Sequence, residues 1–482
     1  MNRDMVRFVL GRLLIIIGLL MVPSIFVAVG FGEGWGGVWP FLIPMVLAML
    51  IGTACSYRRP ENSDFFMREG FAVVGLTWLL LSLFGAIPFM LSRTIPHWSD
   101  AIFESVSGFT TTGASVVPFP EDLPKSILFW RSFSHLIGGM GVLVFALAVM
   151  PRIRTDDVFI MQAEVPGPTF GKIRSRVKST ARVLYAMYLV LTLLIAILLM
   201  FGHMPPFEAF LNAFGAAGTG GFGLYSDSIA HYASPYIQYV LAIGMLLFGI
   251  NFNLYYAFIF RRVYGAFKSE ELRWYLGIIG GAVLIILLNT RALYASFAVQ
   301  FREVFFTVVS LITTTGYSVT DFEKWPLLSH VILLALMFVG GMAGSTAGGL
   351  KVSRVALYIK SSLMEIKTNM NPKRRLQLRF EGKPVSPTLR ANVHQYLAIY
   401  ILVFMVLFII VSFHAPNMTS AFTSVAATFN NIGPGFDAVG PTRSYAGLSD
   451  LSKVTLSLGM IMGRLEIIPI LVLFSHRTWR RI

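Results

Sequence analysis

Long apolar runs are spread along the whole of this 482-residue chain, for example at residues 13–29, 183–201 and 331–339. Only 13% of the residues are charged, against about 25% in an average soluble domain. The mean hydropathy is +0.70. Because a lipid core admits helices whose backbone groups are satisfied within each segment, the pattern predicts an all-α polytopic membrane protein.

The positive charge is concentrated in short segments between the apolar runs. The formal net charge is +15. Beside Arg3, Arg7 and Arg12, the basic residues gather at 58–68, 152–182, 261–273, 351–390 and 477–481. The positive-inside rule predicts that these segments and both termini are cytoplasmic. This placement argues against nucleic acid as a partner, and anionic lipid is the expected partner of the cluster at 367–390.

The alternation of apolar and basic segments predicts about ten membrane crossings. The first two form an N-terminal hairpin within residues 1–60. The other eight form four pairs, whose second members are expected at 126–150, 236–262, 326–360 and 451–475. Between the members of each pair lies a segment too short to cross, since ten helical residues span about 15 Å. We therefore expect four helix, pore helix plus filter, helix (M1–P–M2) repeats around one pseudo-fourfold pore, at 61–155, 156–265, 266–385 and 386–482.

The four short segments resemble one another. They read FESVSGFTTTGAS (103–115), FLNAFGAAGTGGF (210–222), FTVVSLITTTGYS (306–318) and TSVAATFNNIGPG (423–435). Aligned without gaps, they place Gly113, Gly220, Gly316 and Gly433 in one column. In three copies a phenylalanine stands ten residues earlier, whereas the fourth has Thr423 there, so the fourth filter is the least regular.

Each copy is a short apolar stretch that ends in small or hydroxyl-bearing residues and a glycine. Irregular backbone at membrane depth is tolerated only inside protein or along a water-filled cavity. Four such strands around one axis would point carbonyl oxygens inward and replace the hydration shell of a cation, and glycine permits the required backbone angles. The alternative is that small residues merely allow close helix packing. Packing alone does not account for a glycine at the same place in every copy.

These motifs, together with several outside the filters, carry a family resemblance. The chain resembles the bacterial Trk potassium-uptake proteins, the TrkH/TrkG type of the Trk/Ktr/HKT superfamily. The resemblance rests on GFTTTGAS, AAGTGGFG, ITTTGYS, NNIGPG, IGGMGVLVFALAVMP, AEVPGP, GGMAGSTAGGLK and MGRLEI, which extend over nearly the whole chain.

The resemblance implies potassium uptake, by a symporter or channel, across the bacterial inner membrane. It implies a homodimer with one pore per subunit and a cytoplasmic TrkA-type subunit that binds the nucleotide, so that this chain carries no cofactor. A glycine in all four filters goes with potassium selectivity in that family. By the same resemblance, the residues that hold K⁺ are Thr111, Thr112, Gly113, Thr219, Gly220, Thr314, Thr315, Gly316, Asn431, Ile432 and Gly433.

A glycine-rich run from Gly340 to Gly349 interrupts the second span of the third repeat. Each glycine weakens a helix by about 1 kcal/mol relative to alanine. We expect a mobile loop beneath the filter that obstructs the pore, with Gly344, Ser345, Thr346 and Gly348 as gate residues; a packed kink is the alternative. Lys351 is expected at the cytoplasmic end of this run.

Arg464 lies about 20 Å into the last apolar span, counted at 1.5 Å per residue from its start. A charge at that depth is costly and faces a cavity or a partner. We expect Arg464 to face the pore as part of the gate, which is also its place in the family. The alternative is a structural ion pair with a carboxylate on another span.

Two other functional classes are alternatives to ion uptake through a pore. A proton-coupled secondary cation transporter needs an intramembrane carboxylate on its path, and Glu104, Glu208 and Glu303 are expected near the outer starts of the pore helices instead. An intramembrane enzyme needs a nucleophile–base pair or a metal site. The histidines are scattered singly, His135 and His330 are expected to be structural, and the lone Cys55 is expected to be inert, so no enzyme is predicted.

Overall fold

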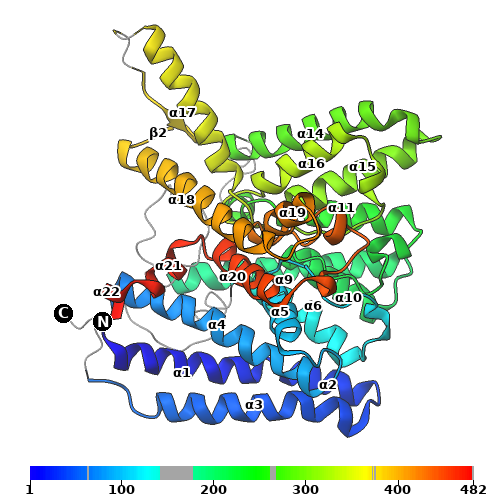
Figure 1. Ribbon diagram of the computed structural model, residues 1–482, viewed down its shortest axis with the longest axis vertical. Helices are drawn as coiled ribbons and strands as arrows, with labels where there is room; N and C mark the ends of the chain where they lie inside the picture. The colour runs from blue at the N-terminus through cyan, green and yellow to red at the C-terminus, as the bar shows by residue number, and fades with distance from the viewer. Residues whose placement is uncertain (62–64, 142–176, 261–267, 372, 374–375, 480–482) are drawn as a thin grey trace.

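The computed structural model describes residues 1–482 except 62–64, 142–176, 261–267, 372, 374–375 and 480–482. The protein is helical, with a single pair of two-residue strands among these residues (Figure 1). Its α-helices and strands are α1 (Arg3–Leu19), α2 (Val22–Gly30), α3 (Gly34–Ser56), α4 (Met67–Leu91), α5 (Trp98–Phe109), α6 (Lys125–Gly139), α9 (Val177–Phe201), α10 (Pro206–Gly218), α11 (Pro235–Phe248), α12 (Phe252–Phe260), α14 (Glu270–Thr290), α15 (Phe297–Ile312), α16 (Leu327–Val339), α17 (Val352–Met370), β1 (Arg379–Phe380), β2 (Lys383–Pro384), α18 (Pro387–Ser412), α19 (Met418–Phe429), α20 (Asp450–Arg464), α21 (Ile468–Phe474) and α22 (His476–Trp479).

After the first three helices, one order of elements recurs four times. A helix of 21 to 26 residues is followed by a short helix of 12 to 16 residues, a stretch of irregular chain and a further helix. The four groups are α4–α5–α6, α9–α10–α11, α14–α15–α16 and α18–α19–α20. The expected boundary at 155–156 and the end of the expected span 126–150 lie outside the described residues.

About ten membrane crossings were expected in an N-terminal hairpin and four pairs, and the structure shows that the second members of the four pairs are not single unbroken helices. Among the described residues, six helices are long and apolar enough to cross a membrane, or seven if α11 and α12, which meet at 91°, form one broken span. The last helix of each group has only 13 to 15 residues and reaches about 20 Å, short of a hydrocarbon core of about 30 Å. Each of these helices stops at or next to a glycine, namely Gly139, Gly249, Gly340 and Gly463.

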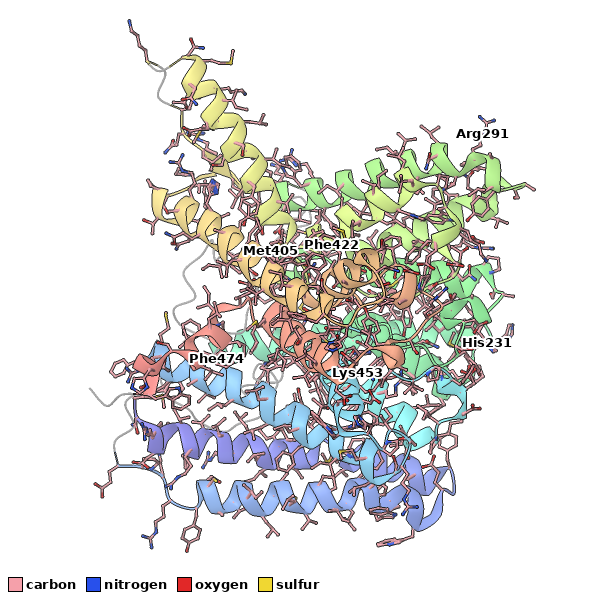
Figure 2. All side chains as sticks on the ribbon, in the orientation of Figure 1. His231, Arg291, Met405, Phe422, Lys453 and Phe474 are labelled. Atoms are coloured by element: carbon pink, nitrogen blue, oxygen red, sulfur yellow. The ribbon has the colours of Figure 1, made fainter. Side chains whose placement is uncertain are left out.

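Both chain ends lie at the same end of the molecule. Arg3 donates from Nη2 to the carbonyl of Trp479 at 2.7 Å, and the β1–β2 pair and the tip of α17 lie at that end too (Figure 1). Phe474 lies toward this end, whereas His231 and Arg291, which precede α11 and α15, lie at the opposite one (Figure 2). The arrangement matches an integral membrane protein with both termini on one side.

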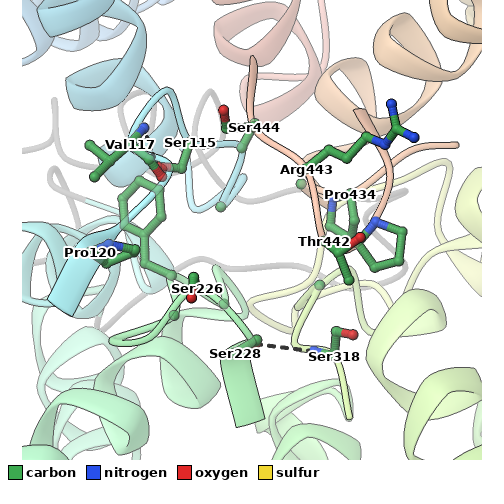
Figure 3. Close-up of a pocket in the computed structure, with 18 of the residues that line it drawn as sticks. Ser115, Val117, Pro120, Ser226, Ser228, Ser318, Pro434, Thr442, Arg443 and Ser444 are labelled. Atoms are coloured by element: carbon green, nitrogen blue, oxygen red, sulfur yellow. Dashed lines mark hydrogen bonds between the residues drawn. The ribbon is translucent and has the colours of Figure 1, made fainter. Parts of the chain in front are cut away.

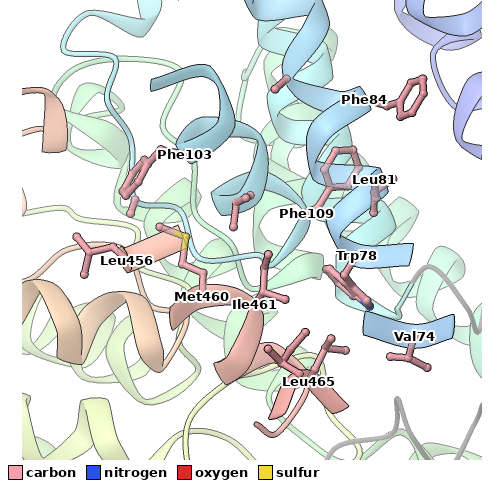
Figure 4. Packing of buried hydrophobic residues seen from close by; sticks show 14 of the residues in the cluster. Val74, Trp78, Leu81, Phe84, Phe103, Phe109, Leu456, Met460, Ile461 and Leu465 are labelled. Carbon is pink, nitrogen blue, oxygen red and sulfur yellow. The ribbon is translucent and has the colours of Figure 1, made fainter. Parts of the chain in front are cut away.

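The short helix α5 is packed between α4 and α20, far apart in sequence. Trp78 and Leu81 on α4, Phe103 and Phe109 on α5, and Met460 on α20 are buried in one apolar cluster (Figure 4). Within a membrane, where lipid tails are as apolar as these side chains, van der Waals packing of this kind holds helices together. This cluster holds α5 at the centre of the protein.

Candidate functional site

The four glycine-containing segments share one backbone conformation. In each, a non-glycine residue with positive φ is followed two residues later by a glycine with positive φ. We name these segments turn 1 (Thr111 to Gly113), turn 2 (Thr219 to Gly221), turn 3 (Thr314 to Gly316) and turn 4 (Asn431 to Gly433). The φ values are +54° to +57° at the first residue and +67° to +99° at the glycine. Threonine rarely adopts positive φ, and such residues concentrate at functional sites.

The structure corrects the alignment of the second copy by one residue. The glycine of turn 2 that matches Gly113 is Gly221, not Gly220. Hydrogen bonding agrees, because the amide of the middle residue of every turn donates five residues back at 2.8–2.9 Å: Thr112 to Ser107, Gly220 to Gly215, Thr315 to Ser310 and Ile432 to Ala427. The shift arises because α10 runs to the residue directly before its turn, whereas the other three short helices stop one residue earlier.

The four turns form a closed ring in chain order. A Cβ atom added to Gly113 would lie 1.8 Å from the carbonyl oxygen of Gly220. A Cβ atom added to Gly221 would lie 1.9 Å from the carbonyl oxygen of Thr315. Added to Gly316 or Gly433, it would lie 1.9 Å from that of Ile432 or 2.8 Å from that of Thr112. Only glycine fits at these contacts, and each turn touches the next around one axis.

An outer cavity of about 620 Å³ opens onto this ring. All four matching glycines line it, together with Asp227 and Arg443 at its rim. Ser318 donates from its backbone amide to Ser228 Oγ at 3.3 Å and so joins the segments that follow turns 3 and 2 (Figure 3). The four short helices end at the turns, so their partially negative C-terminal ends lie next to the ring, which favours a cation there.

An ion pair supports the segments that follow turns 1 and 2. Arg131 of α6 donates from Nε to Glu104 of α5 at 2.8 Å, and both side chains are buried. The same guanidinium donates to Ser115 Oγ at 3.1 Å and to the carbonyl oxygen of Gly223 at 3.3 Å. Glu104 also accepts from the amide of Val116 at 2.9 Å. This network fixes the chain just beyond the two turns, and sequence reasoning missed it because its members are distant in sequence.

His135 lies one helical turn after Arg131 and contacts α5 and the residue that follows turn 2. Its Nδ1 lies 2.8 Å from the carbonyl oxygen of Gly108, and the amide of Phe222 donates to its Nε2 at 3.3 Å. This pattern assigns the proton to Nδ1. His330 contacts the carbonyl oxygen of Phe322 through Nε2 at 2.9 Å. Among the described residues, no group of three or more His, Cys, Asp or Glu side chains is placed to hold a metal.

The loop between α16 and α17 (340–351) lies directly against turns 3 and 4. The amide of Gly348 donates to Thr314 Oγ1 at 2.6 Å. A Cβ atom on Gly348 would lie 2.3 Å from the carbonyl oxygen of Asn430. Thr346 donates from Oγ1 to Phe248 O at 3.2 Å, Ser345 donates to Met342 O at 2.6 Å, and Gly344 O accepts from the amide of Phe252 at 3.1 Å. Of the four expected gate residues, Gly348 therefore contacts the ring directly, and the other three lie in the same loop.

Arg464 is the last residue of α20 and is buried. Its guanidinium donates to the carbonyl oxygens of Thr346, Gly138 and Gly139 at 2.7, 2.5 and 2.7 Å. It thus joins the α16–α17 loop to the end of α6. Lys351, expected at the cytoplasmic end, is buried instead, and its ammonium group donates to the carbonyl oxygen of Ala347 within the loop.

Glu466, two residues after Arg464, points to another partner. Its carboxylate accepts from Arg354 at 3.0 and 2.5 Å, and this guanidinium lies 4.0 Å from the ring centroid of Tyr396. Positive φ at Glu466 and Ile467 breaks the chain between α20 and α21 and turns the Glu466 side chain toward α17.

The carboxylates of the short helices have identifiable partners. Glu208 accepts from the hydroxyls of Tyr225 and Tyr232 at 3.1 and 2.6 Å, and Glu303 accepts from Tyr294 at 2.8 Å. Glu104 differs from the expectation, because it lies in the middle of α5 and is fully buried. Its pairing with Arg131 places it against the segment that follows turn 1.

Comparison with known proteins gives one consistent family. The TrkH family model, described as a cation transport protein, matches residues 40–480. The Trk system potassium uptake protein TrkH of Salmonella typhimurium is 34% identical over 98% of both chains, and TrkG of Escherichia coli K12 is 32% identical over the full length of both. The crystal structure of the potassium transporter TrkH from Vibrio parahaemolyticus matches with a TM-score of 0.88 and 31% identity over all of both chains.

Proposed function

Because the chain belongs to the TrkH family of cation transport proteins, we propose that it mediates potassium uptake through one pore whose filter is the ring of turns 1 to 4. The observation that carries this proposal is the contact of each turn with the next, which brings four segments from across the chain around one axis. The same proposal divides the chain into a hairpin (1–60) and four pore units (61–155, 156–265, 266–385 and 386–482).

The ions would be held by backbone carbonyl oxygens of the turns. These belong to Thr111, Thr112, Gly113, Thr219, Gly220, Gly221, Thr314, Thr315, Gly316, Asn431, Ile432 and Gly433. Carbonyl oxygens around an axis replace the hydration shell of a cation, and the adjacent helix C-termini stabilise its charge. The buried Glu104–Arg131 pair holds two of the turns in place and would limit how far the filter relaxes around a smaller ion.

The gate in this proposal consists of the α16–α17 loop and Arg464. Gly348 hydrogen-bonds turn 3, and Arg464 brings a full positive charge against the middle of the loop. A positive charge in a poorly screened site repels a permeating cation. The loop must leave its contacts with Thr314, Phe248 and Arg464 for ions to pass.

The remaining parts of the proposal concern the cell and the partners. The basic segments between spans support a bacterial inner-membrane protein with cytoplasmic termini. The relatives are named as parts of a Trk system, which supports a cytoplasmic TrkA-type subunit that carries the nucleotide. A homodimer and contact of the 367–390 segment with anionic lipid complete the proposed assembly.

Reversal potentials measured in liposomes test the transported ion. Separate gradients of potassium, sodium and protons are imposed on the purified protein. The proposal expects the reversal potential to follow the potassium gradient, with sodium contributing little. A reversal potential that follows protons would favour a coupled transporter, and equal responses to sodium and potassium would overturn the filter assignment.

A further inference from the structure

One buried carboxylate at the start of α14 holds the α16–α17 loop at two points. Oε1 of Glu271 accepts from the amide of Ala343 at 2.8 Å and from the amide of Ser353 at 3.1 Å. Ala343 lies inside the loop, whereas Ser353 lies in the first turn of α17. A single oxygen atom therefore bridges the two ends of the loop. Glu271 is buried, with only 6% of the residue's surface exposed.

The hydrogen bonds that Glu271 accepts are costly to break. The first amides of a helix have no partner within the helix, and an anion at this end is favoured by the helix dipole. The residue before α17, Lys351, provides no side-chain cap. Glu271 fills that role from a different helix, through its hydrogen bonds with the amides of Ala343 and Ser353. Movement of Ala343 away from its position costs one of them.

A second carboxylate fixes the place of the first. Glu381, in the turn between β1 and β2, accepts through Oε1 from Ser269 Oγ at 2.7 Å and from the amide of Glu271 at 2.9 Å. Its φ is +52° and that of Gly382 is +71°. Glutamate rarely adopts such an angle, so the turn holds this side chain against α14 at some conformational cost. The strand pair lies at the end of the molecule where both termini lie (Figure 1).

Lys360 ties the same elements together from α17. Its ammonium group donates to Glu270 Oε1 at 2.5 Å and to the carbonyl oxygen of Arg379 at 2.6 Å. Glu270 Oε2 in turn accepts from the amide of Glu381 at 3.1 Å. The strand pair, the start of α14 and α17 thus form one hydrogen-bonded unit around the base of the loop.

We propose that Glu271 is the positioning residue that holds the α16–α17 loop in its obstructing place, and that Glu381 transmits displacements of the strand pair to it. The inference rests on the loop being the gate, as proposed above. A regulatory subunit that moved the strand pair or α17 would weaken the hold of Glu271 on Ala343 without touching the pore.

The test measures rubidium-86 uptake into proteoliposomes by the full chain and its variants. Glu271→Ala removes the acceptor, and uptake is expected to rise roughly tenfold, as a loss of about 1.4 kcal/mol from the closed state would produce. Glu271→Gln keeps an oxygen acceptor at the same place and should restore most of the closure. Glu365→Ala is the matched control, because Glu365 is an exposed carboxylate on α17, and it should leave uptake at the wild-type value.

Deletion of 343–348 separates failure of this inference from failure of the gate. If the deletion raises uptake and Glu271→Ala adds nothing in the deleted background, Glu271 acts through the loop. If the deletion raises uptake but folded Glu271→Ala does not, the positioning role is wrong while the gate stands. If the deletion itself leaves uptake unchanged, the loop is not the gate and the inference falls with it.

Glu381→Gly provides a second variant should Glu271→Ala fail to fold. Two successive glycines suit a turn with positive φ at both central residues, so the strand pair is retained while the carboxylate is lost. Uptake by this variant is expected to rise by about threefold, or roughly 0.7 kcal/mol. Wild-type uptake by folded Glu381→Gly would overturn the link from the strand pair to the loop.

Discussion

Arg464 and Thr346 are joined by a hydrogen bond of 2.7 Å that connects the last residue of α20 to the α16–α17 loop. The same guanidinium holds the carbonyl oxygens of Gly138 and Gly139 at the end of α6. Three parts of the chain, from the first, third and fourth units, therefore meet at one cation. In the gate proposed above, its hydrogen bond to the loop and its charge would both oppose the passage of a cation.

Arg464→Ala is expected to raise potassium uptake roughly tenfold. A hydrogen bond to a charged group is worth about 1.5–3 kcal/mol, and each 1.4 kcal/mol corresponds to a factor of ten. Arg464→Lys keeps the charge and should retain much of the barrier. Uptake and thermal stability are measured on the same purified proteins. A large loss of stability with no gain in uptake would indicate that Arg464 has a structural role instead of a gate role, because its removal leaves the carbonyl oxygens of Thr346, Gly138 and Gly139 without this donor.

Gly221→Ser and Gly113→Ser should both raise the permeability of sodium relative to potassium. Gly220→Ser should instead lower thermal stability. A Cβ at Gly113 or Gly221 meets a carbonyl oxygen of the next turn within 2 Å, and φ is positive at both. At Gly220 the Cβ would meet Nδ1 of His135 at 2.2 Å, behind the ring. Overpacking of this kind costs about 1–3 kcal/mol. Relative sodium and potassium permeabilities and thermal stability distinguish the two effects; a selectivity change confined to Gly220→Ser would restore the ungapped alignment.

The alignment of the second copy illustrates what sequence alone could and could not give. AAGTGGFG contains four glycines, and an ungapped comparison selects Gly220. A spacing signal was nevertheless present, because a threonine or asparagine stands two residues before the matching glycine in every turn, which selects Thr219 and Gly221. Burial at the start of the segment agrees: Leu211, ten residues before Gly221, is buried, whereas Phe210 is only partly so.

Hydropathy predicted the long helices and the four repeated units but not the breaks in the second helix of each unit. Hydropathy is averaged over a window of residues, so it does not show that one helix ends before Gly249 or that another ends just after Gly463. The interruption after α16 was expected because its glycines are consecutive. The roles of Glu271 and Arg131 were beyond reach, since Glu271 depends on Ala343, 72 residues away, and Arg131 depends on Glu104, 27 residues away. Such contacts follow only from the assembled fold.

Glu104→Gln is expected to destabilise the protein by about 3–5 kcal/mol, because it leaves the buried guanidinium of Arg131 without its anionic partner. Sodium rejection should fall as well, since Arg131 also holds Ser115 and Gly223 beyond turns 1 and 2. Glu303→Gln is the matched control on α15, where the carboxylate is only partly buried and accepts from one tyrosine. Thermal unfolding measures the loss of stability, and the ratio of sodium to potassium permeability measures the loss of sodium rejection. Equal effects of Glu104→Gln and Glu303→Gln would contradict a special role for the Glu104–Arg131 pair.

Thr314→Val should raise potassium uptake roughly fivefold, because the amide of Gly348 loses its acceptor at 2.6 Å and a neutral hydrogen bond is worth about 1 kcal/mol. Valine has the same branched shape, but positive φ strains any such residue.

Thr111→Val therefore serves as the reference. Thr111 occupies the matching position of turn 1 with φ of +54°, against +57° at Thr314. Its Oγ1 has no hydrogen-bond partner among the residues that the structure describes. Strain at this backbone position affects both variants alike, so the excess uptake of Thr314→Val over Thr111→Val measures the contact between loop and filter. Equal uptake by the two variants would show that the Gly348–Thr314 bond does not hold the loop.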